Sequence, residues 1–321
     1  METPLFVNPL ENQMIVPVAV LLLVAFGGAA CALQALQLGS GLFFRGHAAP
    51  AGETPVRLLW QRYRTWAIIA PLFAGAALSG PLAVALLCAF LCWQGGREYA
   101  MLTALPPLQR AMLIAGGWIS LAAVLVFGSE ALLAAPVLAF FASSLLALQP
   151  IVGETGVERR FAACIAAMWG YLYAGWLPAC LVALSAGKAP GLVLLAGLGV
   201  ALSDVGAFCA GKAIGGAKLA PRLSPNKTWG GVLGNLLGAA LAVLLAGFAL
   251  PDFVWWQRAL FIVPIALGSV WGDLLESLLK RQSGVKDAGA LLPGFGGLLD
   301  RIDSLLLVAP LVYYLSRLLL G

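Results

Sequence analysis

Long apolar stretches separated by short polar segments dominate the chain. A helix that crosses a membrane needs about 20 apolar residues, within a range of about 17–25. Such stretches predict membrane-spanning helices at residues 14–38, 112–128, 131–148, 161–185, 190–210, 229–250, 254–275 and 302–320. A further apolar run at 66–93 is interrupted by Ser79, Gly80 and Pro81, which predicts either one kinked helix or two short ones.

The positions of the Lys and Arg residues decide between these alternatives. Positive residues collect in the cytoplasmic loops of membrane proteins. The segments 39–65 and 211–228 each contain four of them, so both are expected in the cytoplasm, with an even number of spans between them. Only the split of 66–93 gives an even number, and it requires two helices shorter than a typical span. The sequence therefore predicts about ten spans, with both termini outside the cytoplasm.

The composition excludes several classes of protein. Of the 321 residues, 61% are hydrophobic and 10% are charged, and the mean hydropathy is +0.95. A soluble domain has about 45–50% apolar and about 25% charged residues. A soluble enzyme, a disordered chain and a nucleic-acid-binding module are therefore excluded, and the chain is predicted to be an all-α polytopic membrane protein. Its net charge of +5 is explained better by topology signals and phosphate ligands than by nucleic acid.

Acidic residues at predicted helix ends collect in the last 120 residues, with Glu98 as the exception. Asp204 lies inside a predicted span, where a carboxylate costs roughly 2.5–3.5 kcal/mol at the helix centre and usually faces the bundle interior. Asp300 and Asp303 are three positions apart at the start of the last span. Carboxylates on converging helix ends are the ligands that hard divalent cations require.

One predicted helix face combines both signs of charge. Asp273, Glu276, Ser277 and Lys280 are spaced so that they lie along one side of a helix. Lys and Arg residues interleaved with carboxylates can hold several phosphates. The combination predicts metal-assisted phosphoryl or nucleotidyl transfer at the cytoplasmic face of the membrane.

A polar loop at 212–228 offers a second set of phosphate ligands. Ser224, Asn226, Lys227 and Thr228 directly precede a predicted helix N-terminus, where free N–H groups favour anions. We expect a phosphate cradle there. The alternative is an ordinary basic loop whose Ser or Thr caps the helix.

These residues resemble the signature of the phosphatidate cytidylyltransferase family (CDP-diacylglycerol synthases), which reads S-x-x-K-R-x4-K-D and then P-G-H-G-G-x-x-D-R-x-D. The matching residues are, in order, Ser277, Lys280, Arg281, Lys286, Asp287, Pro293, Gly294, Gly296, Gly297, Asp300, Arg301 and Asp303. The stretch 203–208 also resembles the family's S-D-T-G-A-Y, and 224–228 its S-P-K-K-T. The resemblance covers about residues 60–320.

Two positions depart from the family pattern. Phe295 stands where the family has His, and Gly230 stands where a Glu is common. His47 is the only histidine of the chain and lies far from the motif in the sequence, so no motif histidine can act as an acid or base. The reaction asks for little proton transfer, because the attacking phosphate is already ionised, and we expect activity to be retained.

The resemblance implies transfer of a cytidylyl group from CTP to phosphatidate in a bacterial inner membrane, with the active site facing the cytoplasm. It implies Mg2+ as cofactor, alone or with a second cation. It implies cation binding by Asp204, Asp273, Asp287, Asp300 and Asp303. It implies catalytic roles for Asp273, Lys280, Asp287, Asp300 and Arg301. It implies nucleotide or phosphate binding by Ser224, Asn226, Lys227, Thr228, Arg281 and Lys286.

The sequence divides into an extra helix with an Arg-rich segment (1–60), an N-terminal membrane part (61–190) and a catalytic part (191–321). Other functions stay open: a cytidylyltransferase or CTP-dependent kinase for another lipid, or a catalytically silent paralogue. A transporter is disfavoured, because the charged cluster lies at one membrane face. Small-residue helix faces are compatible with a homodimer and equally with close packing inside one bundle.

Overall fold

A computed structural model describes residues 4–38, 55–147, 156–291 and 296–321. Pro293, Gly294 and Phe295 of the motif, and Arg45 and His47, lie outside the described residues. The elements are η1 (Pro9–Glu11), α1 (Ile15–Leu38), α3 (Pro55–Leu78), α4 (Pro81–Leu102), α5 (Pro107–Phe127), η2 (Gly128–Glu130), α6 (Ala131–Ala147), α7 (Val157–Gly170), the π-helix η3 (Tyr171–Trp176), α8 (Ala179–Ala186), α9 (Gly191–Ala213), β1 (Lys218–Ala220), β2 (Ser224–Thr228), α10 (Trp229–Leu245), η4 (Gly247–Ala249), α11 (Trp255–Leu260), α12 (Ile262–Gln282) and α13 (Leu299–Leu320).

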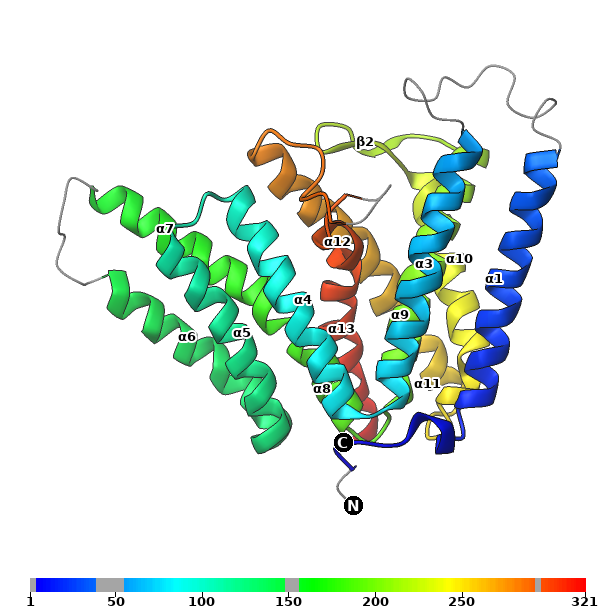
Figure 1. Cartoon of the computed structure of the whole chain (residues 1–321), viewed down its shortest axis with the longest axis horizontal. Coiled ribbons are helices and arrows are strands. Elements are labelled where there is room, and N and C mark those ends of the chain that lie inside the picture. The colour runs from blue at the N-terminus through cyan, green and yellow to red at the C-terminus, as the bar shows by residue number, and fades with distance from the viewer. Residues whose placement is uncertain (1–3, 39–54, 148–155, 292–295) are drawn as a thin grey trace.

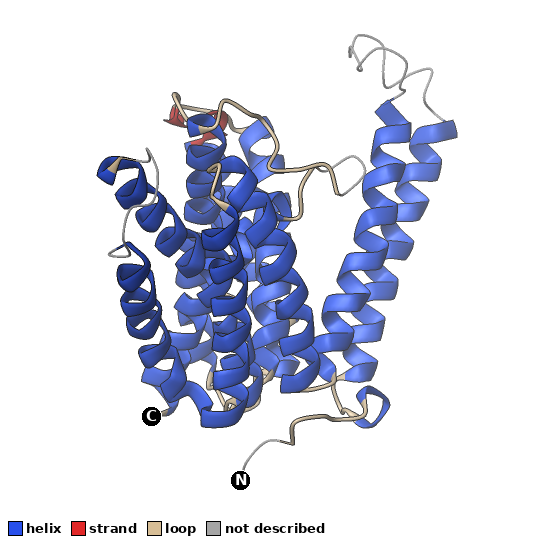
Figure 2. Cartoon of the chain, turned by 60° about the vertical axis from the view of Figure 1, so that its left-hand side comes forward, coloured by secondary structure: helices blue, strands red, loops and turns tan. Residues whose placement is uncertain are grey.

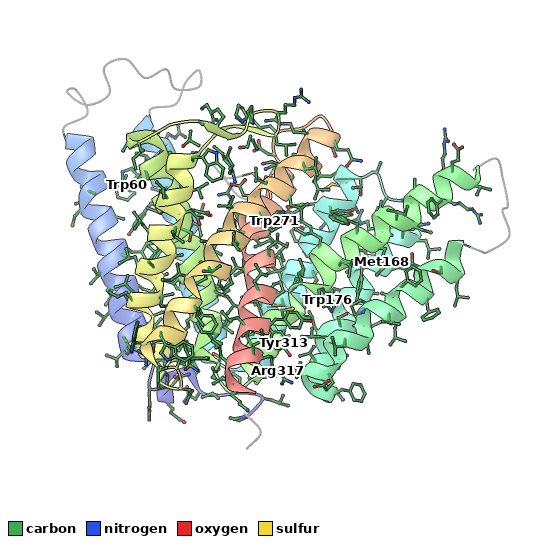
Figure 3. The ribbon with its side chains drawn as sticks, turned by 180° about the vertical axis from the view of Figure 1, so that it is seen from behind. Trp60, Met168, Trp176, Trp271, Tyr313 and Arg317 are labelled. Carbon is green, nitrogen blue, oxygen red and sulfur yellow. The ribbon has the colours of Figure 1, made fainter. Side chains whose placement is uncertain are left out.

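The long helices stand side by side as one bundle (Figure 1). The β-hairpin, the end of α12 and the start of α13 lie at its upper end, and both chain termini lie at its lower end. Two cationic residues are at the lower end: Lys188 donates to the carbonyl oxygens of Leu320 and Gly321, and Arg317 lies near Glu130 (Figure 3). The basic hairpin and these residues thus occupy opposite ends of the bundle.

The all-α membrane fold predicted from the sequence is confirmed. Among the described residues, six helical stretches are long and apolar enough to cross a membrane: Ile15–Gln34, Pro107–Leu145, Val157–Ala186, Gly191–Ala213, Trp255–Gln282 and Leu299–Leu320. Trp229–Leu245 is apolar but shorter. The count of about ten spans stays a prediction.

The apolar run at 66–93 is split where the sequence predicted. α3 ends at Leu78, Gly80 has a φ of 92°, and α4 begins at Pro81. A positive φ suits glycine, and Pro suits the first helical position. The expectation of two short helices is wrong, since α3 and α4 have 24 and 22 residues. Both helices continue past the apolar run into polar sequence, because backbone hydrogen bonding does not stop where hydropathy falls.

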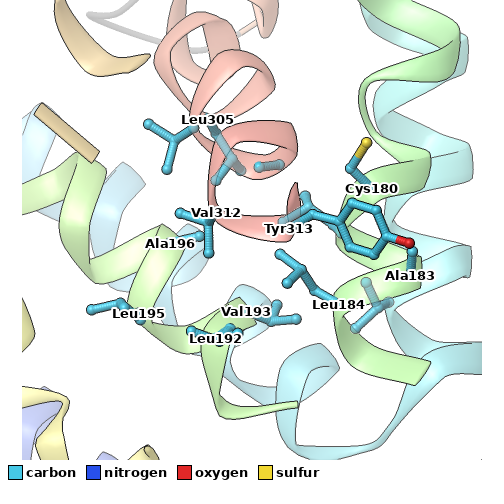
Figure 4. Packing of buried hydrophobic residues seen from close by; sticks show 14 of the residues in the cluster. Cys180, Ala183, Leu184, Leu192, Val193, Leu195, Ala196, Leu305, Val312 and Tyr313 are labelled. Atoms are coloured by element: carbon cyan, nitrogen blue, oxygen red, sulfur yellow. The ribbon is translucent and has the colours of Figure 1, made fainter. Parts of the chain in front are cut away.

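The interior of the bundle is packed with small and medium apolar side chains. Cys180 of α8, Leu195 and Ala196 of α9, and Val312 of α13 are fully buried around Tyr313 (Figure 4). Lipid is as apolar as leucine, so helices in a membrane associate through close packing and not through the hydrophobic effect. This core fixes α13 against α8 and α9.

Glycine allows α9 and α10 to approach each other at backbone distance. A Cβ at Gly234 would lie 2.1 Å from the Gly206 carbonyl oxygen, and one at Gly238 would lie 2.2 Å from that of Leu202. Gly230 continues this face, and a Cβ there would lie 2.6 Å from the Gly215 oxygen. The departure from the family's Glu at this position therefore has a packing reason: a side chain there would collide with the backbone of Gly215 in the turn after α9.

Gly234→Ala is expected to lower the thermal unfolding temperature in detergent, because overpacking costs about 1–3 kcal/mol. The matched control is Gly28→Ala on α1, where a Cβ meets nothing within 4 Å. Replacing glycine inside a helix at such an open position is neutral or stabilising, by up to about 1 kcal/mol. Tryptophan fluorescence during heating measures both, and equal midpoints for the two variants would contradict the packing argument.

Candidate active site

A buried ion network joins α12 to α13. The Lys280 Nζ lies 2.6 Å from Glu276 Oε2, one helical turn away, and 2.7 Å from Asp300 Oδ1 at the start of α13. The side chains of Glu276 and Asp300 are 2% and 3% exposed. Buried charges require partners, so this lysine holds the two helix ends together. The predicted helix face of Asp273, Glu276 and Lys280 is thus present on α12.

Three carboxylates converge beside this network. One oxygen each of Asp273, Glu276 and Asp303 lies within 4.8 Å of the other two. Asp303 and Glu276 are buried, and Asp273 is half-buried. The Glu276 Oε1 atom has no hydrogen-bond partner in the described part of the chain. This carboxylate trio, Asp273, Glu276 and Asp303, has the all-oxygen chemistry that a hard divalent cation prefers.

Asp300 lies outside the trio. Its Oδ1 contacts Lys280, and its Oδ2 accepts hydrogen bonds from the backbone N–H groups of Ala288 (2.9 Å) and Gly297 (2.8 Å). Gly296, with a φ of 87°, makes the turn that brings this backbone to the carboxylate. In this structure Asp300 therefore organises the segment before α13, and its predicted cation contact stays a prediction.

The predicted polar loop is a two-stranded antiparallel hairpin, in which Lys218 pairs with Thr228 and Ala220 with Ser224. Successive side chains of a strand point to opposite faces, so Lys227 lies on the other face of β2 from Ser224, Asn226 and Thr228. The Lys227 Nζ lies 2.5 Å from Asp273 Oδ2, so the hairpin reaches the trio. The hairpin could not be predicted from the sequence, because β1, the strand that pairs with β2, has only three residues.

Thr228 acts as the N-cap of α10, since its Oγ1 accepts a hydrogen bond from the Gly231 N–H. This is the capping role that the sequence analysis kept as an alternative. Arg281 Nε donates to the Leu223 carbonyl oxygen at 3.3 Å and ties the hairpin to the end of α12. Both contacts place predicted phosphate ligands at the upper end of the bundle.

Other predicted residues are more open. Asn226, Lys286 and Asp287 are exposed near the hairpin and after α12, Ser224 is half-buried, and Asp204 is exposed on α9. Arg301 is half-buried in the first turn of α13. The structure does not add Asp204 or Asp287 to the carboxylate trio.

Glu98 fixes the N-terminus of α13 from another helix. It is 1% exposed on α4; its Oε1 accepts from the Leu298 N–H (2.9 Å) and the Gln94 amide (2.7 Å), and its Oε2 accepts from the Leu299 N–H (2.7 Å). Free N–H groups at a helix start favour a negative charge. The sequence showed Glu98 as a carboxylate near a helix end, and only the fold shows which helix it caps.

Tyr173 also lies near the site, although no sequence motif indicates it. It lies on the π-helix η3, is 2% exposed, and its hydroxyl has no hydrogen-bond partner among the described residues. Asp303, Glu276 and Asp273 are within electrostatic range of it. π-Helical turns occur often at functional sites, and this one delivers a hydroxyl to the neighbourhood of the carboxylate trio.

One known protein family matches the part of the chain that contains the whole candidate site. The Cytidylyltransferase family matches residues 60–319, which include the hairpin, the trio and the ion network. The chain belongs to this family. Helix α1 lies outside the residues matched by this cytidylyltransferase profile.

Individual relatives of this cytidylyltransferase-family chain are similar to it in sequence over only part of its length. A phosphatidate cytidylyltransferase of Brucella suis is 45% identical over 111 residues, covering 35% of this chain and 41% of the relative. One of Rickettsia bellii is 40% identical over 124 residues, covering 36% and 54%. The Arabidopsis thaliana protein named phosphatidate cytidylyltransferase 5, chloroplastic, is 36% identical over 189 residues, covering 50% and 46%. The chain thus spans about half, or less, of these relatives' lengths.

Glu98→Gln is expected to loosen the start of α13 in this cytidylyltransferase-family protein, because the amide nitrogen cannot accept a backbone N–H. Hydrogen–deuterium exchange over residues 296–301 should become faster. Glu130→Gln is the matched control, since Glu130 is 76% exposed and pairs only distantly with Arg317, at 3.8 Å. Unchanged exchange in Glu98→Gln would show that its contacts do not hold the helix.

Proposed function

We propose that this protein transfers a cytidylyl group from CTP to phosphatidate, giving CDP-diacylglycerol and pyrophosphate. The observation that carries the proposal is the carboxylate trio lying directly beside Lys227 and Lys280 at one end of an apolar bundle. Such a site can hold a cation and phosphates together, and its membrane position suits a lipid phosphate. The names of the relatives support the same substrates.

The carboxylate trio fits Mg2+ in its donor chemistry. Its oxygens come from two helices that the Lys280 network fixes, and Glu276 Oε1 is buried with no hydrogen-bond partner among the described residues. Asp273, Glu276 and Asp303 would hold the ion, and Glu276 thereby joins the predicted ligands. A bound Mg2+ would neutralise charge on the triphosphate oxygens.

Lys227 is the residue best placed to change partners. In this structure it neutralises Asp273, a half-buried carboxylate at the edge of the trio. A cation on Asp273 would replace that neutralisation, and the lysine on its hairpin would turn to a phosphate. Arg281, Lys286 and Arg301 would supply further positive charge, whereas Lys280 stays with Glu276 and Asp300.

The reaction then needs positioning more than proton transfer. An oxygen of the phosphatidate phosphate forms a bond to the α-phosphorus of CTP, and the bond from that phosphorus to the oxygen bridging to the β-phosphorus breaks. The pyrophosphate carries the bonding electrons away. A phosphate monoester is largely ionised at neutral pH, since its second pKa is about 6. The cationic side chains hold the two anions in line, and the absence of a motif histidine leaves this step intact.

Asp273→Asn is expected to lower turnover by roughly 100-fold or more, since a bound metal contributes several kcal/mol to such reactions. Asp252→Asn is the control, because Asp252 is an exposed residue in the turn before α11. The assay uses purified protein in mixed micelles with phosphatidate, Mg2+ and α-labelled CTP, and follows label into the lipid. Equal activity of the two variants would remove Asp273 from the site.

The label also separates the competing functions. A cytidylyltransferase moves the α-label into the lipid, whereas a CTP-dependent kinase moves only the γ-phosphate and leaves labelled CDP. A silent paralogue is favoured if no label moves to phosphatidate or to another lipid acceptor, and if the Phe295→His variant shows no activity either. We also propose that the hairpin end faces the cytoplasm of a bacterial inner membrane, where CTP is available.

A further inference from the structure

A long apolar slot separates the α1–α3 helix pair from the rest of the bundle. Figure 2 shows this pair standing at one side of the molecule. The slot has a volume of about 380 Å³, within the range of ligand pockets. Its walls include Leu22 of α1, Phe73 of α3, Leu91 of α4, Leu198 of α9 and Leu305 of α13.

Among the described residues that line this slot, Arg301 is the only charged one. It lies in the first turn of α13, at the hairpin end of the bundle, and Asp303 and Asp204 are within its electrostatic range. Leu22 is the eighth of the 24 residues of α1, a helix that begins at the opposite, lower end of the bundle (Figure 1). The slot therefore runs from the candidate active site along most of the height of the bundle.

Helix α1, which lies outside the residues matched by the family, packs against α3 at its lower end. Val18 packs against Ala74 and Leu78 of α3. The Asn12 side chain donates to the Leu78 carbonyl oxygen at 3.0 Å, and the Val7 N–H donates to that of Ser79 at 2.9 Å. These contacts hold Leu21 and Leu22 at the slot.

The chemistry of the slot selects one kind of occupant. Its apolar walls suit a hydrocarbon chain, and a guanidinium at the end near the carboxylate trio suits a phosphate. We propose that the slot holds one acyl chain of the lipid phosphate substrate, with Arg301 at its phosphate end and α1 limiting which chains fit. This inference rests on the proposed function, because it assigns the lipid subsite of the same reaction.

Leu22→Trp tests the slot, and Leu23→Trp is the matched control. Leu22 is half-buried and lines the slot, whereas its neighbour Leu23 is 73% exposed and points away from the bundle. Leu22→Trp should raise KM for dioleoyl phosphatidate about tenfold, because the extra bulk overfills the slot. KM for CTP and for dihexanoyl phosphatidate, whose short chains do not reach Leu22, should stay unchanged. Equal effects of the two variants, or of Leu22→Trp on both lipids, would overturn the proposal.

Photo-crosslinking tests the same slot without turnover. The full-length protein in nanodiscs is exposed to phosphatidate, or to phosphatidylcholine, carrying a diazirine near the end of one acyl chain. Phosphatidate should label Leu21 and Leu22 several-fold more than phosphatidylcholine does. Equal labelling would mean that bulk membrane lipid fills the slot, which overturns the proposal. Selective labelling without cytidylyl transfer would keep the slot and reject the proposed function.

Discussion

Lys280 brings a positive charge between two carboxylates that are almost completely buried, and the upper end of the bundle depends on this contact. Removing one partner of such a buried pair typically costs about 3–5 kcal/mol, because the remaining charge stays uncompensated. The network fixes α13 against α12 and thereby sets Asp303 against Asp273 and Glu276. Glu98 and Asp300 extend the same principle to the backbone: Glu98 accepts from the N–H groups of Leu298 and Leu299 at the start of α13, and Asp300 accepts from those of Ala288 and Gly297 in the segment before it.

The parts of the fold that the sequence predicted are those fixed by local chemistry. Apolar runs long enough to span a membrane became helices, and Ser79, Gly80 and Pro81 ended one helix and began the next. The spacing of Asp273, Glu276 and Lys280 required only that the segment be helical. Of the residues that the family motif named, Lys280, Asp300 and Asp303 do lie close together, because they sit on the end of α12 and the start of α13, whereas Asp287 is exposed outside the trio.

The parts that the sequence did not predict depend on contacts between distant segments. Glu98 and Leu298 are 200 positions apart, so nothing local indicates that one caps the other. Glu276 was recognised on its helix face but not as a ligand, because its membership of the trio depends on where α13 lies. The reason for Gly230 likewise appears only when the start of α10 is seen to meet the turn after α9 at backbone distance.

The π-helix η3 joins α7 to α8 in one helical rod, and it changes the direction in which the side chains of α8 point around the rod axis. The Leu177 N–H bonds to the Leu172 carbonyl oxygen, five positions back, so one turn absorbs an additional residue. Since each residue of an α-helix advances about 100°, α8 is rotated by that amount relative to a regular continuation of α7. All the residues Ala179–Ser185 of α8 are buried, so this rotation decides which neighbouring helix each of them faces. A one-residue gap at 171–176 in an alignment with a relative would record a rotation of α8, not a change in the length of the rod.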